Sequence, residues 1–296
     1  MSETIPSTEA PDARFDTSDS WSTDLVLEAL WEGQATALAA VRAALTATGT
    51  AVEAAATRLR AGGRLAYAGA GTSGRLGALD AAELPPTFGV TAPLLLLAGG
   101  IDALANAAEG AEDDADAGRT AVDAVALGPA DVLVAIAASG TTPFTCAAVV
   151  AARTRGCLTI AIANAADSPL LHQAEHKLLL ASGAEPIAGS TRMRAGTAQV
   201  VALKLFSTAL MMALGHTYRG RMVDMRPTNA KLRARAARTL RDLAGCDEAT
   251  ATQALALTGG NVKRAVLLVR GAEPDTALAL LDRHGNHLRR ALDSLS

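Results

Sequence analysis

Short apolar runs alternate with polar turns and with helix-type spacing through most of the chain. Four of these runs, which are apolar at nearly every position, predict strands at residues 64–70 (RLAYAGA), 131–137 (DVLVAIA), 157–164 (CLTIAIAN) and 176–182 (HKLLLAS). Continuous apolar runs of this length are typical of strands that are buried on both faces. Because helical patterns separate them, the sequence predicts an α/β fold, with a parallel sheet as the middle of three layers.

The pattern divides the chain into three parts. Residues 1–20 lack periodicity and are rich in Asp and Ser, which predicts a flexible N-terminal arm. Residues 21–235 hold the α/β pattern. Residues 240–296 predict a small module of three short helices, in which Asn261 and Asn286 are the expected N-caps. This module resembles the ubiquitin-associated fold, and its sequence identifies no partner.

The sequence predicts helices before and after the first strand. Apolar residues at spacings of three and four predict helix over residues 23–63, with Gly62 and Gly63 as the stop signal. The second helix follows the first strand and covers residues 75–84. We expect it to end before Pro85 and Pro86, because proline interrupts a helix.

Composition excludes several classes of function. The chain has 296 residues, of which 50% are hydrophobic and 3% aromatic, and its net charge of -3 gives no general attraction to nucleic acid or to an anionic membrane. No stretch of ~18 apolar residues predicts a membrane span. The N-terminus lacks the basic start and apolar centre of a secretory signal, so we expect a cytoplasmic protein. Three widely spaced cysteines argue against a disulfide framework.

Three turns rich in Gly, Ser and Thr precede helices, at residues 69–74 (GAGTSG), 138–142 (ASGTT) and 189–196 (GSTRMRAG). Backbone N–H groups at a helix N-terminus, together with small hydroxyl side chains, form a cradle for a phosphate. The first turn has neither the spacing of a dinucleotide fingerprint nor the lysine of a P-loop. A single turn of this kind also serves packing. Three of them at one sheet edge favour a small sugar phosphate as the ligand.

Carboxylates near these turns suggest proton transfer. Glu83 lies at the end of the helix that begins in the first turn. Glu109 and Glu112 are three residues apart and would share a face if their segment is helical, so that either could face Glu83 across a pocket. Spacing does not decide between them. Asp113 and Asp114 are also explained as acidic residues at the start of a helix.

The segment at residues 172–176 (HQAEH) has the H-x-x-E-H spacing of a zinc peptidase helix. It lies directly before a predicted strand and is too short for the long helix that such a site needs. No third ligand follows. We therefore expect neither a metal nor a cofactor.

The motifs GAGTSGRLGALDAAELPPTFG, EGAEDD, IAASGTTPF, GSTRMRAGTAQ and NAKL together resemble the bacterial N-acetylmuramic acid 6-phosphate etherases, which are built on the sugar isomerase (SIS) domain. The resemblance extends from about residue 8 to the C-terminal module. It implies a carbon–oxygen lyase of the hydro-lyase type. The family cleaves the D-lactyl ether of its substrate to N-acetylglucosamine 6-phosphate and D-lactate during peptidoglycan recycling, by β-elimination and addition of water.

The resemblance also implies roles for individual residues. Glu83 corresponds to the proton donor, and Glu112, rather than Glu109, to the base. For Glu83 to hold a proton near neutral pH, we expect it to be buried beside Leu84 and Phe88. The residues that would bind the sugar phosphate are Ser73, Ser139, Thr141, Thr142, Ser190 and Thr191. A homodimer is implied as well, because SIS domains commonly complete each other's pockets.

Two positions depart from the family pattern. Arg194 stands where the family usually has Lys, and Asp12 where it usually has Asn. Arg192 and Arg194 are candidates either for substrate ligands or for interface ion pairs. Two other functions of SIS domains stay open, a regulator that binds sugar phosphates without turnover and an aldose-ketose isomerase. Release of lactate separates both from an etherase.

Overall fold

A computed structural model describes residues 6–106 and 108–295 of the chain. These residues form two compact units. The first contains residues up to 81 and residues 93–207, and the second contains residues 82–92 and 208–296. The predicted boundaries at residues 20, 235 and 240 stay a prediction.

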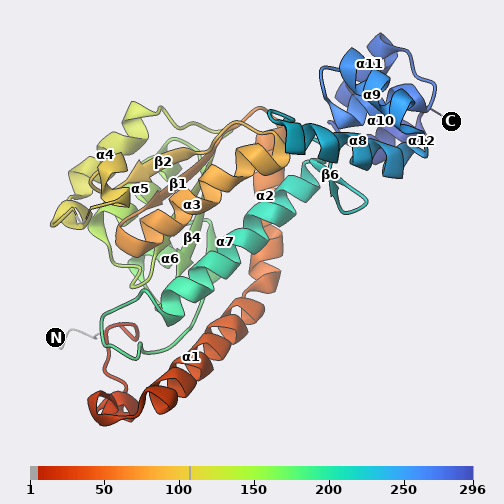
Figure 1. Cartoon of the computed structure of the whole chain (residues 1–296). Helices are drawn as coiled ribbons and strands as arrows, with labels where there is room; N and C mark the ends of the chain where they lie inside the picture. Colours follow the sequence, from red (N-terminus) through yellow and green to blue (C-terminus); the bar gives the residue numbers. More distant parts are fainter. Residues whose placement is uncertain (1–5, 107, 296) are drawn as a thin grey trace. The chain divides into compact units, whose positions relative to one another are not determined.

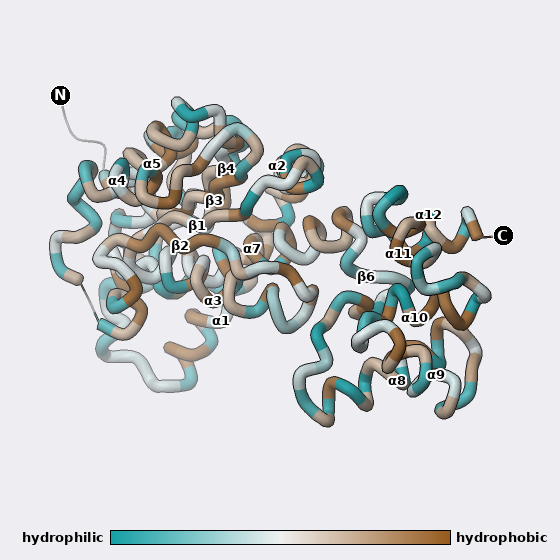
Figure 2. Tube along the Cα trace, turned by 90° about the horizontal axis from the view of Figure 1, so that it is seen from above, coloured by the Kyte–Doolittle hydropathy of each residue, from teal (hydrophilic) through white to brown (hydrophobic). Residues whose placement is uncertain are grey.

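The first unit is built on a five-stranded parallel sheet with the strand order β2-β1-β3-β4-β5. Its strands are β1 (Leu65–Gly69), β2 (Leu94–Leu97), β3 (Val132–Ala137), β4 (Leu158–Ala163) and β5 (His176–Leu179). Every residue of β1, β3 and β4 is buried, as the continuous apolar runs predict. Figure 2 shows β1, β2 and β3 mostly in hydrophobic shades. The predicted α/β class and the four predicted strands are confirmed.

Helices cover both faces of this sheet (Figure 1). One face carries α4 (Ala115–Ala124), α5 (Pro143–Thr154) and α6 (Pro169–Gln173), whose apolar side chains pack with alternate residues of β1, β3 and β4. The helices α2 (Leu45–Arg60), α3 (Gly71–Phe88) and α7 (Arg194–Ala213) cover the other face. The remaining elements of this unit are α1 (Thr23–Ala43) and the short 3-10 helices at Ala13–Phe15, Ser18–Ser20, Ile101–Leu104 and Ala111–Asp113. The predicted three-layer arrangement is therefore present.

The helix expected over residues 23–63 is interrupted at Ala44, where α1 and α2 meet at an angle of 54°. The carbonyl oxygen of Ala44 accepts hydrogen bonds from both the backbone N–H and the hydroxyl of Thr48, each at 2.9 Å. A threonine hydroxyl that bonds back to the carbonyl four residues earlier bends a helix. Apolar spacing alone did not reveal this bend.

The expected end of the second helix before Pro85 was wrong, since α3 continues to Phe88 with both prolines inside it. Proline fixes φ near the helical value, so it removes two backbone donors here without forcing the chain out of the helix. The Pro85 carbonyl still accepts a hydrogen bond from the N–H of Gly89 at 2.9 Å. Gly89, with φ of +70°, then ends the helix in the left-handed region.

The second unit contains a short antiparallel hairpin and a group of helices around their own apolar core. The elements are β6 (Thr217–Tyr218), β7 (Arg221–Met222), α8 (Ala230–Ala244), α9 (Glu248–Leu257), α10 (Val262–Val269), α11 (Pro274–Arg283) and α12 (Leu288–Asp293). Asn261 caps α10 as predicted, by accepting from the N–H of Arg264 at 2.9 Å. Asn286 is not a cap. Its φ is +64°, His287 occupies the cap position of α12, and four helices follow residue 245 instead of the expected three.

Within the described ranges, α7 is long and apolar enough to cross a membrane, and α1 and α2 pass the same test only as a bent pair. However, 56% of the 18-residue apolar stretch of α7 is buried inside the fold. Its buried polar residues Gln199 and Ser207 hydrogen-bond to side chains of other elements. We therefore interpret α7 as a core helix.

Candidate active site

A polar cavity of about 330 Å³ opens at the carboxyl edge of the sheet, where the segments that follow β1 and β3 lie next to each other. The strand order reverses between these two strands, because β2 lies on one side of β1 while β3, β4 and β5 follow on the other. Open α/β sheets bind ligands at such a switch point. The predicted cradle therefore lies where this architecture places a ligand.

The structure gathers most of the predicted binding residues at this cavity. Ser73, Ser139, Thr141, Thr142 and Thr191 line it, and Glu112 lines it as well. Ser190 lies between the lining residues Gly189 and Thr191 and is half-buried. Segments that are far apart in sequence thus meet here, as expected for turns that end parallel strands. The individual ligand roles stay a prediction.

In the first turn, the residues that pack closely differ from those that line the cavity. A Cβ atom on Gly74 would lie 2.9 Å from the backbone of Gly69, so both glycines permit the close approach of β1 and the start of α3. The turn predicted at residues 71–74 is already helical, since α3 begins at Gly71. Thr72 and Ser73, on its first turn, face the cavity. The packing interpretation of this turn is therefore confirmed, and its role in ligand binding stays a prediction.

Ser73 belongs to a buried chain of hydrogen bonds. Its hydroxyl donates to Oε1 of Gln199 at 2.9 Å, and Nε2 of Gln199 donates to Oδ1 of Asn164 at 2.9 Å. Nδ2 of Asn164 in turn donates to the Leu180 carbonyl at 3.0 Å and to the Ser182 hydroxyl at 3.1 Å. The chain links α3, α7 and the ends of β4 and β5. The Ser73 proton is therefore engaged with Gln199, and the Ser73 oxygen can still accept a hydrogen bond at the cavity.

A second buried cluster fixes the same pair of helices further along. The carboxylate of Asp80 on α3 accepts from the Tyr67 hydroxyl at 2.7 Å and from the Ser207 hydroxyl of α7 at 3.1 Å, and Lys204 lies 3.1 Å from it. Burial, with the neighbouring Asp80 carboxylate, raises the pKa of Tyr67 well above its ordinary value. Tyr67 therefore stays a hydrogen-bond donor and holds α3 against β1.

The second turn forms another part of the cradle. The hydroxyl of Ser139 accepts from the backbone N–H of Thr141 at 3.3 Å and from its hydroxyl at 2.9 Å. Thr142 occupies the cap position of α5 without a side-chain capping bond, and Pro143 is the first helical residue. The hydroxyl of Thr142 and the N-terminal end of α5 are thus directed to the cavity, where the helix dipole favours an anion.

The structure distinguishes the two glutamates of the EGAEDD motif. Gly110, with φ of +71°, stands between them, and only the short 3-10 turn Ala111–Asp113 is helical there, so the shared helix face that we considered does not form. Glu112 lines both the polar cavity and a neighbouring one of about 240 Å³, whereas Glu109 lines the neighbouring cavity. Asp114 is the N-cap of α4 and accepts from the N–H of Ala117 at 2.8 Å.

Glu83 lies in the second unit, on α3, ten residues after Ser73 in the sequence. Its side chain is exposed, although its neighbours Leu84 and Phe88 are buried. The prediction that Glu83 is buried is therefore wrong for a single copy of the chain. Its predicted role as proton donor stays a prediction.

The two arginines of the third turn differ. Arg192 is exposed. Arg194 is 4% exposed and pairs with Asp12 at 3.5 Å, so the two departures from the family pattern meet in one ion pair. One residue that sequence reasoning missed is Glu9, which lines the cavity from the segment predicted as a flexible arm. The available signal was the short TEAPD motif, in which Glu9 comes three residues before Asp12.

Comparison with known proteins decides the family. A protein of Deinococcus radiodurans named N-acetylmuramic acid 6-phosphate etherase is 46% identical over 93% of this chain and 91% of its own length. The chain belongs to the N-acetylmuramic acid 6-phosphate etherase family. An etherase of this name from Streptomyces coelicolor is 46% identical over 87% of this chain and 84% of its own length. The predicted resemblance is therefore confirmed.

Domain-level comparisons agree with the etherase family's SIS architecture. A family model for the SIS domain matches residues 116–209, and one for the N-terminal SIS domain of glucokinase regulatory protein matches residues 48–153. A Listeria monocytogenes structure, provisionally described as a sugar-phosphate isomerase, aligns with 67% of this chain and 95% of its own, with a TM-score of 0.51 and 18% identity. At this identity the likeness shows the shared SIS fold alone.

Proposed function

We propose that this member of the etherase family cleaves the D-lactyl ether of N-acetylmuramic acid 6-phosphate. The products are N-acetylglucosamine 6-phosphate and D-lactate, which makes the protein a carbon–oxygen lyase of the hydro-lyase type. What supports the proposal is the extent of the family match together with a cavity lined by hydroxyl groups and Glu112 at the strand switch point. The reaction serves peptidoglycan recycling, and we expect it in the cytoplasm.

An alkyl ether is a poor leaving group, so direct hydrolysis is difficult. In the open-chain aldehyde form, however, the proton on carbon 2 lies next to a carbonyl and can be removed. We assign this step to the Glu112 carboxylate, which lines the cavity on a short turn fixed by Gly110 and Asp114. The electrons of the broken C–H bond form the double bond between carbons 2 and 3 as the C–O bond at carbon 3 breaks.

The departing lactate oxygen needs a proton, and this is the role that we propose for Glu83. Water then adds across the double bond, with its oxygen bonding to carbon 3 and a proton returning to carbon 2. Because Glu83 is exposed in a single copy of the chain, we propose that it acts within a homodimer, where a second copy covers it. Burial there would favour the protonated carboxyl group.

The phosphate of the substrate belongs at the hydroxyl cradle. Ser139, Thr141 and Thr142 present hydroxyl groups beside the N-terminus of α5, and Ser73 and Thr191 also line the cavity. Helix N-termini bind phosphate through backbone N–H groups and the helix dipole. This end of the cavity holds the phosphate while carbons 2 and 3 lie toward Glu112.

The test is incubation of the full chain with N-acetylmuramic acid 6-phosphate in deuterated water, followed by measurement of lactate and of the mass of the sugar product. We expect lactate, and one deuterium at carbon 2 of N-acetylglucosamine 6-phosphate. Binding of the substrate without lactate release would overturn the etherase proposal and favour a regulator. A sugar isomer formed without loss of lactate would favour an isomerase.

Two variants then separate the proposed roles. Glu112→Gln removes the base and is expected to lower both lactate release and deuterium exchange at carbon 2 by at least 100-fold. Glu83→Gln is expected to abolish lactate release while exchange at carbon 2 continues. Glu109→Gln is the matched control, because Glu109 lies in the same motif. Wild-type turnover in Glu112→Gln or in Glu83→Gln would remove that residue from the mechanism.

A further inference from the structure

The N-terminal segment contributes a wall of the polar cavity. Thr8 is fully buried, and Glu9 lines the cavity together with Glu112 and the hydroxyl cradle. A backbone hydrogen bond from the N–H of Glu9 to the Pro6 carbonyl, at 2.9 Å, closes a turn that directs this part of the chain. Gly189 in the third turn packs against it, since a Cβ atom there would lie 3.1 Å from Oε2 of Glu9.

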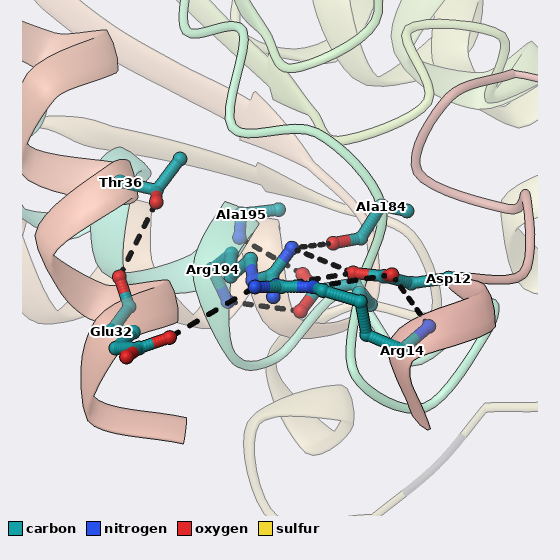
Figure 3. Close-up of polar contacts among 8 residues, drawn as sticks. Asp12, Arg14, Glu32, Thr36, Ala184, Arg194 and Ala195 are labelled. Atoms are coloured by element: carbon teal, nitrogen blue, oxygen red, sulfur yellow. Dashed lines mark hydrogen bonds and ion pairs between the residues drawn. The ribbon is translucent and has the colours of Figure 1, made fainter. Parts of the chain in front are cut away.

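A buried arginine anchors this segment (Figure 3). The Arg194 guanidinium lies 3.5 Å from the Asp12 carboxylate, donates to the Ala184 carbonyl at 2.5 Å, and has Phe15 with its ring centre 5.7 Å away. A Cβ atom on Gly33 would lie 2.6 Å from Nε of Arg194, so α1 also packs closely on it. These contacts fix the guanidinium between α1 and the N-terminal segment.

The same arginine begins α7. Its backbone N–H and that of Ala195 both donate to the fully buried Glu185 carboxylate at 2.9 Å, which caps the helix. Five residues further on, Gln199 bonds to Ser73 in the cradle. The N-terminal segment and the cradle are therefore fixed to the same turns of α7.

Asp12 is held in its charged form. Burial raises the pKa of its carboxyl group, but the hydrogen bonds and charge of Arg14 and the charge of Arg194 outweigh this and leave the pKa below its ordinary value. Arg14 lies 3.3 Å from Asp12 and Arg194 3.5 Å from it. Because Arg194 is almost wholly buried, loss of the Asp12 charge would leave it without its carboxylate partner.

The chemistry of Glu9 limits what it can contact. An ionised carboxylate is an acceptor of hydrogen bonds and is repelled by a phosphate dianion. It therefore suits the sugar end of a sugar phosphate, where hydroxyl and amide N–H groups are donors. Its position against Gly189 lies on the third turn, whereas the N-termini of α3 and α5 mark the phosphate end.

We propose that Glu9 is a substrate-binding residue that accepts hydrogen bonds from the sugar, and that the Asp12–Arg194 pair is a positioning pair that holds Glu9 at the cavity. The proposal rests on the proposed function for the identity of the sugar phosphate. It adds a third carboxylate to the site, one that recognises the sugar and carries no proton in the reaction.

The test measures the affinity of the full chain for two probes, N-acetylglucosamine 6-phosphate and inorganic phosphate, by calorimetry. Glu9→Gln is expected to weaken sugar-phosphate binding about tenfold, the size of one hydrogen bond to a charged group, and to leave phosphate binding unchanged. Glu32→Gln is the matched control, because Glu32 is an exposed carboxylate 3.9 Å from Arg14 and outside the cavity. Equal affinity for the sugar phosphate in Glu9→Gln and wild type would overturn the substrate contact, as would an equal loss for both probes.

A double-variant measurement tests the positioning role of the Asp12–Arg194 pair. Asp12→Asn alone is expected to weaken sugar-phosphate binding about threefold, and added to Glu9→Gln it should weaken binding no further, because it acts through Glu9. Independent effects, with the double variant about 30-fold weaker, would refute the positioning role. If wild type releases no lactate yet Glu9→Gln loses sugar-phosphate affinity selectively, the proposed reaction fails and the contact stands. If wild type releases lactate and Glu9→Gln binds as wild type, this proposal alone fails.

Discussion

Replacing Gln199 with glutamate tests whether the buried hydrogen-bond chain supports the cradle. Gln199 is 1% exposed and uses both ends of its amide, accepting from Ser73 and donating to Asn164. The variant Gln199→Glu keeps the shape and the acceptor for Ser73 but places an oxygen opposite Oδ1 of Asn164. The Asn164 amide cannot turn over in response, because its Nδ2 already donates to Leu180 and Ser182.

The expected cost follows from these contacts. One buried hydrogen bond is lost and one buried acceptor is left unsatisfied, which costs about 3 kcal/mol at pH 7. A protonated carboxyl group could donate to Asn164 and restore the bond, so the pKa of the introduced group is raised in the folded state. The variant should therefore be closest to wild type below about pH 4 and lose stability relative to it as pH rises.

The assay is urea unfolding followed by far-UV circular dichroism at several pH values. Gln253→Glu serves as the control, because Gln253 is exposed on α9 and its replacement is expected to change the free energy of unfolding by less than about 0.5 kcal/mol. The same Gln199→Glu variant should bind inorganic phosphate more weakly, because the introduced carboxylate places a negative charge next to Ser73 at the cradle. A free energy of unfolding within about 0.5 kcal/mol of wild type at pH 7 would refute the assigned network.

Two further predictions concern groups that do not line the cavity. Asp131 accepts from the backbone and side chain of Arg64 and from Gly128; burial raises its pKa, but these bonds and the Arg64 charge outweigh it and hold the pKa below its ordinary value. The stabilisation contributed by the Asp131 carboxylate is thus present above about pH 4 and lost below it. Asp131→Asn should therefore lower the free energy of unfolding by about 2 kcal/mol at pH 7 in thermal or urea unfolding, and by progressively less on acidification. A loss that stays unchanged down to pH 3 would contradict this. Burial raises the pKa of the Cys157 thiol to about 12 and that of Cys146 to about 11. Iodoacetamide at pH 8 should therefore modify Cys246 first, as followed by mass spectrometry. Early labelling of Cys157 would show that β4 opens.

Sequence patterns predicted the elements whose signal is local. The apolar runs identified β1, β3, β4 and β5, because a strand covered on both faces must be apolar at consecutive positions. The three polar turns could be predicted to lie at one edge of the sheet, because the carboxyl ends of parallel strands meet at the same edge. Residues that line the cavity from these turns, such as Ser73 and Thr141, could therefore be named in advance as candidates.

Features that depend on contacts distant in sequence escaped prediction. We propose that the contact of Asp12 with Arg194 holds Glu9 at the cavity, and nothing in the local pattern of Asp12 or Arg194 indicates that contact. The continuation of α3 through Pro85 likewise depends on where its last carbonyls bond. The exposure of Glu83 belongs to the same class, because burial of one side chain is decided by what packs on it.

Three polar residues of the apolar helix α7 connect it to other segments of the first unit. Arg194 at its first residue holds the N-terminal segment, Gln199 holds Ser73, and Ser207 holds Asp80 on α3. The first contact joins α7 to the N-terminal segment and the other two join it to α3, while the apolar residues between them pack in the core. A buried polar group is tolerated only when it is paired, so each contact also fixes the rotation and register of α7. The cradle, the N-terminal segment and α3 are thus positioned by one helix, and a change in its rotation would displace all three together.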